Sequence, residues 1–176
     1  MKIIHNYTGK SLLQLREQFG VGKKGFYNND WWLKDEFAKE TPKKGTYEIE
    51  LHPEWNNLNC QEQLDKIGDE MGFLHPAVLA EAILTHYKET NERLMDNWFS
   101  RTCSVDSSGR RVLVGYFDSV GLYVAYYWGD YRVSDIGVAS ARKLNLKPRT
   151  LEPFESRLLE LENFKEKVEK VLKQMI

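Results

Sequence analysis

The hydrophobic spacing of this chain changes near its middle from a helical repeat to an alternating one, and this change limits the fold most strongly. Between Pro76 and Leu94, apolar residues recur at the three- and four-residue steps of an amphipathic helix, and proline suits its first position. From Trp98 onward the period is two, which is typical of strands. Both patterns in one chain predict the α+β class.

The clearest strands are expected over residues 112–117 and 121–128. Residues 118–121 would connect them as a short hairpin, and 129–135 have the polar, glycine-bearing composition of a surface loop. Residues 136–142 are expected to form a closing strand. Together these segments predict a meander of short antiparallel strands.

Shorter elements are expected before that region. Ser11 and Gln14 have the spacing of a capping box, and a short helix should follow until Gly20. Residues 45–51 alternate β-forming and charged residues as a half-buried strand does, and 59–68 show a helical pattern. The expected fold is therefore two helices packed on a meander of antiparallel strands, with an N-terminal α/β extension.

The last segment, 147–176, is charged and helical in pattern. Four apolar residues recur every seven positions: Phe154, Leu161, Val168 and Met175. Phe164 and Val171 occupy the intervening apolar positions of the heptads. Three heptads suit docking on the chain's own domain as well as pairing between protomers, so a homo-oligomer through 151–176 stays open. We expect one domain over 1–146 followed by an amphipathic C-terminal helix over 147–176.

Composition argues against several classes of function. The 176 residues carry 25 basic and 26 acidic side chains, so no positive field is available for a nucleic acid. The N-terminal apolar run is short, and no window approaches the roughly 20 apolar residues that span a bilayer. Cys60 and Cys103 form no ligand pattern, which favours reduced thiols. We expect a cytoplasmic protein without membrane contact, and association with a virion stays open.

Aromatic residues gather in two stretches of the sequence. Those in 25–40 are expected to pack at an edge of the core. Residues 116–131 hold five tyrosines among small residues and aspartates, a composition that binding loops favour because tyrosine offers rigid contact area. Strand alternation places Tyr123, Ala125 and Tyr127 on the outward face. Packing of these rings within the sheet is the competing interpretation, since tyrosine also suits strands.

Two short motifs resemble the C-type-lectin-like domains of bacteria and phages. Residues 98–102, WFSRT, are similar to the W-x-S/R-T step of those domains, and 136–143, IGVASARK, are similar to their closing strand. The resemblance covers about 74–143, and the lectin-like part would extend over about 45–143. The family includes the variable proteins of diversity-generating retroelements and the related domains of the formylglycine-generating-enzyme-like and DUF1566-like kinds.

The resemblance implies a rigid scaffold that displays changeable side chains to a ligand, which would be another protein or a surface ligand. The positions that fit such changeable sites are Asp118, Ser119, Tyr123, Ala125, Tyr127, Asp130, Tyr131, Ser134 and Asp135. Trp128 would belong to the scaffold. The chain lacks the Glu-Pro-Asn, Gln-Pro-Asp and Trp-Asn-Asp triplets of calcium-dependent lectins, so binding is expected without calcium.

Catalysis is not expected of this chain. Ser100, Cys103, His75 and His86 are nucleophile and base types, but none stands in a nucleophile-elbow, Cys/His or metal-ligand pattern. Neither a cofactor nor a metal is therefore expected. The competing function is structural, with the β face and the heptad tail both serving self-association or a fixed partner protein.

Overall fold

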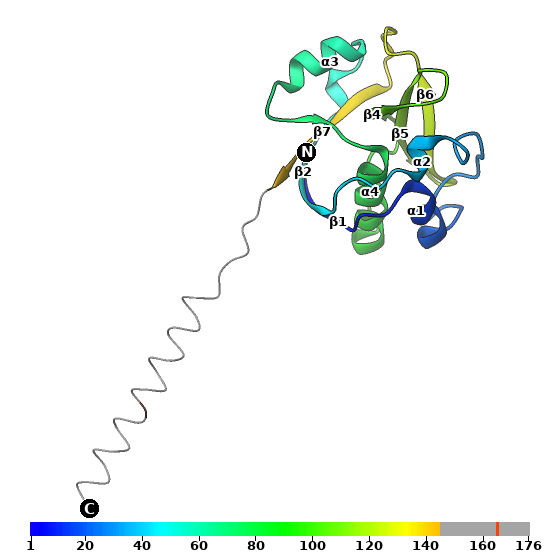
Figure 1. The fold of residues 1–176 in the computed structure, drawn as a ribbon, viewed down its shortest axis with the longest axis vertical. Helices are drawn as coiled ribbons and strands as arrows, with labels where there is room; N and C mark the ends of the chain where they lie inside the picture. Colours follow the sequence, from blue (N-terminus) through cyan, green and yellow to red (C-terminus); the bar gives the residue numbers. More distant parts are fainter. Residues whose placement is uncertain (145–164, 166–176) are drawn as a thin grey trace, which may run out of the picture. The chain divides into compact units, whose positions relative to one another are not determined.

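The computed structural model describes residues 1–144 and Lys165, and residues Met1–Leu144 form one compact unit. In this unit four α-helices and one short 3-10 helix pack with a seven-stranded sheet (Figure 1). The predicted α+β class is confirmed. The helix predicted over 147–176 lies outside the described residues.

The strands are β1 (Lys2–Tyr7), β2 (Gly45–His52), β3 (Gly72–Phe73), β4 (Phe99–Val105), β5 (Arg111–Asp118), β6 (Gly121–Tyr127) and β7 (Ile136–Leu144). The helices are α1 (Leu12–Phe19), α2 (Glu36–Lys39), the 3-10 helix η1 (Pro53–Trp55), α3 (Cys60–Ile67) and α4 (Pro76–Thr90). Within the part of the chain that the structure describes, no helix is long and apolar enough to cross a membrane.

The strand order is β1-β2-β7-β4-β5-β6, and β3 pairs with β7. β5 and β6 form the predicted hairpin, and β4 pairs antiparallel with β5 on its other edge. β7 does not continue this meander: it lies between β2 and β4 and runs parallel to β4. A strand forms where one was predicted over 136–142, but its predicted place at the end of an all-antiparallel meander is wrong. The first five residues of β7 are all buried, because this strand has neighbouring strands on both edges and is covered on both faces.

The N-terminal residues, expected as an extension, are an integral part of the same sheet and core. β1 pairs with β2, and α1 packs against α4. Tyr7, Leu12 and Leu15 are buried in the main hydrophobic cluster. The first two strands and the first helix therefore help to hold the later strands in place.

Local sequence signals set the helix ends. Gln14 N–H donates to Ser11 Oγ and Ser11 N–H donates to Gln14 Oε1, which is the predicted capping box of α1. Gly20 ends α1 at a φ of 74°, a backbone conformation that favours glycine. The apolar pattern predicted a helix that continues toward Leu94. α4 ends earlier, at Thr90, because Asn91 adopts the left-handed backbone conformation.

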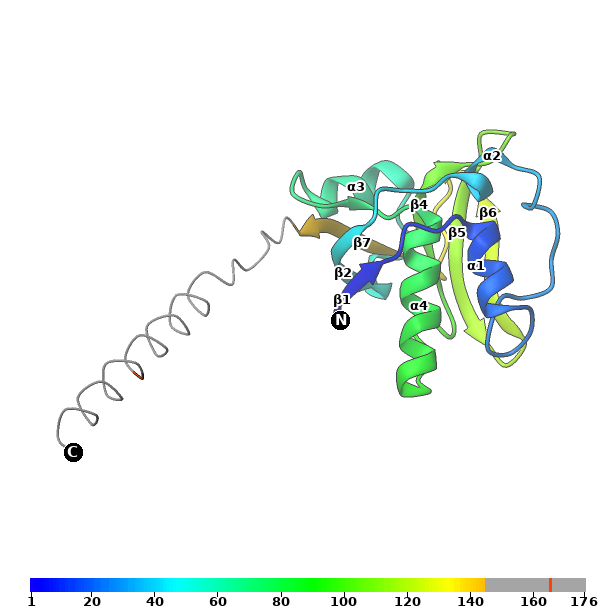
Figure 2. The ribbon, with the colours of Figure 1, turned by 60° about the horizontal axis from the view of Figure 1, so that its bottom comes forward.

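The core lies between one face of the sheet and the two helices α1 and α4, which Figure 2 shows in front of β4, β5 and β6. The aromatic residues between α1 and β2 supply part of it, as predicted. Phe26, Trp32 and Phe37 are buried, and the Phe26 and Trp32 ring centroids lie 5.9 Å apart. Each buried side chain of this size stabilises the fold by about 1.5–3 kcal/mol.

The second face of the sheet is covered only in part. α3 and η1 lie over β7, where Gln63 Nε2 donates to the carbonyl oxygens of Trp55 (2.8 Å) and Ile136 (3.0 Å). Among the described residues no helix lies over this face at β6. The uncovered area therefore includes the tyrosines that alternation predicts to face outward.

Candidate functional site

The side chains of β6 divide between the two faces of the sheet as the alternation predicts. Leu122 and Val124 are buried in the core, whereas Tyr123 and Ala125 on the second face are half-buried and Tyr127 is 40% exposed. Because β5 pairs with β6 in register, these side chains stand beside those of β5 on the second face. The β6 tyrosines Tyr123 and Tyr127 therefore lie on the second face, outside the main core.

A β-bulge in β5 brings another tyrosine to this face. The register with β6 shifts between Gly115 and Asp118, and Tyr116 within the bulge has a φ of 52°. A non-glycine residue in this left-handed region costs on the order of 1–3 kcal/mol, and bulges commonly redirect a side chain near a functional site. The Tyr116 ring lies 5.1 Å from that of Phe99 and 6.4 Å from that of Tyr123.

The segment that follows α1 supplies a further ring. Tyr27 N–H donates to the carbonyl oxygen of Leu122 at 2.8 Å, which fixes this segment along the free edge of β6. The Tyr27 ring stacks on that of Tyr123 with centroids 4.1 Å apart. We define the aromatic face as these second-face rings together with the loop tyrosine described next: Tyr27, Phe99, Tyr116, Tyr123, Tyr127 and Tyr131.

The loop between β6 and β7, residues 128–135, is held to the sheet by a buried arginine. Arg101 of β4 donates from Nη2 to the carbonyl oxygen of Tyr131 (2.7 Å) and from Nη1 to that of Leu58 (3.0 Å) and to Gln63 Oε1 (2.7 Å). Its side chain is fully buried, and this burial lowers the pKa of Arg101. The Tyr131 ring, 57% exposed, meets that of Tyr127 edge-on at 5.7 Å.

The same loop is joined to the start of α3. Arg132 forms a two-point ion pair with Glu62, and Asn59 N–H also donates to the Glu62 carboxylate. The Arg132 guanidinium and this backbone donor lower the pKa of Glu62 to about 2. Asn57 N–H donates to the Val133 carbonyl oxygen at 2.9 Å. The backbone of the loop is therefore fixed at several points while its tyrosine ring stays exposed.

The structure brings only some of the predicted site residues together. Tyr123, Ala125, Tyr127 and Tyr131 lie on or beside the aromatic face. Asp118 and Ser119 belong to the β5–β6 turn, where Asp118 Oδ1 accepts from Val120 N–H at 2.8 Å. The pKa of Tyr123 is raised, first by partial burial and second by the negative charge of Asp118. The Asp118 end of the β5–β6 turn is therefore close to the aromatic face.

The other three predicted residues lie along the loop before β7. Asp130 is exposed, and the carbonyl oxygen of Ser134 accepts from Asn56 Nδ2 at 2.8 Å. The carbonyl oxygen of Asp135 accepts from Phe99 N–H at 2.8 Å. Ser134 and Asp135 thus position the loop through their backbones.

Three residues of the aromatic face were not among the predicted site residues: Tyr27, Phe99 and Tyr116, of which Tyr116 belongs to the tyrosine-rich stretch 116–131. Tyr27 comes from the stretch that was expected to pack in the core, and the bulge that turns Tyr116 has no clear sequence signature. A further group surrounds the edge of β6: Trp31 lies edge-on to Tyr126 at 4.7 Å, and the Arg110 guanidinium lies 3.3 Å from the Tyr126 ring centroid. Tyr126 and Trp128 are 39% and 50% exposed.

Two of the nucleophile and base types of the sequence, Ser100 and His75, make structural hydrogen bonds. Ser100 is buried and its Oγ accepts from Ala139 N–H, and His75 Nδ1 accepts from Ala77 N–H at the start of α4. Cys60 and Cys103 are both free thiols. Among the residues that the structure describes, no three or more His, Cys, Asp or Glu side chains form a group that could hold a metal ion.

In comparisons with known proteins, no family model, no curated protein and no solved structure matches the chain.

Proposed function

We propose that this domain is a recognition module that binds a protein or another surface ligand through the aromatic face. The observation that carries the proposal is the continuity of the rings: Tyr27, Tyr123, Tyr116 and Phe99 follow one another at centroid distances of 4.1, 6.4 and 5.1 Å on an uncovered part of the sheet. Partly exposed aromatic rings of this kind are the commonest anchors of protein interfaces.

The support around the rings favours binding over packing. Tyr116 is held in a strained backbone conformation, and the Tyr131 backbone is fixed by Arg101. A surface that is ordered before a ligand arrives loses little conformational entropy on binding. Tyr127 and Tyr131 are the most exposed of these rings, so we assign them the role of anchors.

We also propose that the scaffold is C-type-lectin-like, and the pairing of the two motif segments supports this. The strands β4 and β7, which contain most of these segments, are neighbours in the sheet, with Phe99 opposite Ile136 and Arg101 opposite Val138. The support lies in this adjacency, because their parallel direction differs from the antiparallel meander expected for the scaffold. In this scaffold the changeable positions would be the side chains around Tyr123, Tyr127 and Tyr131. Sequences of close paralogs test this: differences concentrated at these positions support the proposal, and differences spread evenly along the chain contradict it.

A selection experiment tests the binding function. A random peptide library displayed on phage is selected against the full chain, and the recovered peptides are titrated against the double variant Tyr127→Ser, Tyr131→Ser. Loss of two aromatic anchors should weaken binding by about tenfold or more, because each anchor contributes at least ~1 kcal/mol.

Stability measurements separate binding from folding in this test. Both rings are exposed, so the double variant should keep its free energy of unfolding within about 1 kcal/mol. Ile4→Ser, which removes an exposed apolar side chain on the distant strand β1, is the matched control and should bind as the wild type does. Peptides that bind the double variant and the wild type equally would refute the proposal, as would a large loss of stability.

A further inference from the structure

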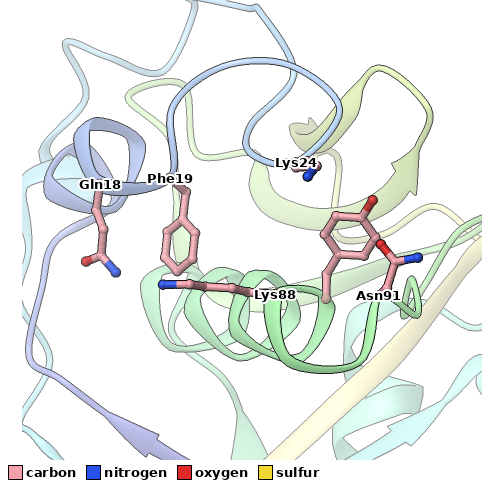
Figure 3. A pocket seen from close by; sticks show the side chains of 6 residues that line it. Gln18, Phe19, Lys24, Lys88 and Asn91 are labelled. Carbon is pink, nitrogen blue, oxygen red and sulfur yellow. The ribbon is translucent and has the colours of Figure 1, made fainter.

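A hollow at the C-terminal ends of α1 and α4 is unrelated to the aromatic face. Its volume is about 300 Å³, within the range of small-molecule sites. Figure 3 shows Gln18 and Phe19 extending from the end of α1 toward α4, where Lys88 runs beneath Phe19 and Lys24 enters from the loop above. The lining residues are Gln18, Phe19, Lys24, Tyr87, Lys88 and Asn91.

The charged side chains that line this hollow are both cationic. Lys24 and Lys88 are exposed, and in the described part of the chain the lysines that form ion pairs are Lys2 and Lys39. Lys24 and Lys88 therefore form no ion pair with another residue of 1–144. Two such groups on opposite sides of a small hollow create a positive potential that an anionic group of a ligand would neutralise.

A third cation stands behind the wall of the hollow. The Arg93 guanidinium lies 4.7 Å from the centroid of the Tyr87 ring and donates to Tyr87 Oη at 3.3 Å and to the Lys23 carbonyl oxygen at 3.1 Å. Arg93 makes no ion pair with a residue of 1–144, and its buried Nε has no hydrogen-bond partner there. Lys24, Lys88 and Arg93 therefore bring three positive charges to this end of the domain, and none of them forms an ion pair with a residue of 1–144.

The neighbouring hollow fixes the orientation that a ligand would take. It has a volume of about 560 Å³, shares Gln18, Phe19 and Lys88 with the first, and is also lined by Glu81 and Glu89. An anionic group would be repelled from these carboxylates and attracted toward Lys24. The half-buried Phe19 ring, which borders both hollows, offers an apolar surface for a flat ring.

We infer that this hollow binds a small anionic ligand with a flat aromatic body, such as an aryl phosphate or aryl carboxylate. The anionic group lies between the ammonium groups of Lys24 and Lys88, and the ring of the ligand packs on Phe19. Inorganic phosphate alone binds more weakly because it lacks the apolar contact, and a neutral phenol binds more weakly because it lacks the charge.

The test is an NMR titration of the full chain with phenyl phosphate, inorganic phosphate and phenol. Phenyl phosphate should shift the resonances of Phe19, Lys24 and Lys88 and bind more tightly than the other two probes. The variant Lys24→Ala, Lys88→Ala should bind phenyl phosphate about tenfold more weakly, since charged hydrogen bonds are lost from both sides of the ligand. Lys34→Ala removes an exposed lysine that does not line the hollow and should leave the affinity unchanged.

The outcome is independent of the function proposed for the aromatic face. Phenyl phosphate should bind the Tyr127→Ser, Tyr131→Ser variant as tightly as the wild type, because those rings do not line the hollow. Equal affinities of the wild type and the double lysine variant would overturn the inference. It would also be overturned if phenyl phosphate produced no shifts at these residues in the folded wild type.

Discussion

Tyr116 is the residue at which local backbone strain and the binding surface meet. Its φ of 52° is unfavourable for a bulky side chain, yet its ring completes the contact between Phe99 and Tyr123. Asparagine tolerates this backbone conformation and valine does not. Replacing Tyr116 by asparagine or by valine removes the ring in both cases, but only valine keeps the backbone strain, so the two effects can be measured separately.

We expect Tyr116→Asn to keep the free energy of unfolding near that of the wild type, because relief of strain offsets part of the lost ring contacts. Tyr116→Val should lower it by about 1–3 kcal/mol more than Tyr116→Asn does. Denaturant unfolding measures both values. Both variants should bind selected peptides less well; a Tyr116→Asn protein that binds like the wild type would show that this ring is not part of the site.

At the same scale, alternation predicted which side chains of β6 face the core and which do not. Leu122 and Val124 are buried, and Tyr123 and Tyr127 lie on the other face, because each strand residue points opposite to its neighbour. The ring of Tyr27 was beyond such reasoning, since its stacking on Tyr123 depends on how a distant segment folds along the strand edge. The sequence pattern thus predicts local direction but not long-range contact.

Among the elements, the loop 128–135 depends most on a single side chain. Arg101→Met would remove the donor to the buried Gln63 Oε1 and to the partly buried carbonyl oxygens of Tyr131 and Leu58, and a buried group without a partner costs about 1–3 kcal/mol. We expect a loss of roughly 3 kcal/mol in stability and faster amide hydrogen exchange over the loop. Arg142→Met, at a partly exposed ion pair on β7, is the control and should leave loop exchange unchanged.

Acid should loosen the same loop through the ion pair of Glu62 with Arg132. The pKa of Glu62 is about 2 in the folded protein and near 4.5 when unpaired, so the contribution of this pair is complete above about pH 4.5 and is lost as the pH falls toward 2. The pair is exposed, so salt should weaken it as well.

Glu62→Gln isolates this effect, because glutamine retains the capping box of α3 but not the charge. In the wild type, amide exchange of the loop should rise between pH 4.5 and 2, measured against the exchange of α4. In the variant it should already be raised at neutral pH and lack this acid step. An identical pH profile in both proteins would contradict the role of the ion pair.

The elements also show what the sequence could and could not predict. Helix ends follow from caps within a few residues, so Ser11 and Gly20 were placed correctly at the two ends of α1. The position of β7 depends on pairing with strands that lie far away in the sequence, and its apolar run does not reveal its neighbours. The β-bulge at Tyr116 likewise involves distant partners, because Tyr116 N–H donates to the carbonyl oxygen of Trp98 and Phe117 N–H to that of Met95, both in the segment before β4.

For the whole molecule, the sheet separates two surfaces with different chemistry. One face is closed by α1 and α4, at whose ends the cationic hollow lies, and the other displays the aromatic face between β6 and the Arg101-fixed loop. This arrangement predicts that changes on one surface leave binding at the other unaffected. The aromatic face lies at the edge of the sheet because of the order of the strands: β7 inserts between β2 and β4, and β6 is the last strand.

The proposed binding function requires the rings on the uncovered face to contact the ligand. The most direct measurement is an NMR titration of the full chain with a peptide recovered by selection, observed through the ring resonances of all nine tyrosines. We predict shifts that are largest at Tyr123, Tyr127 and Tyr131 and absent at Tyr7 and Tyr47. Shifts confined to tyrosines away from the aromatic face would contradict the account.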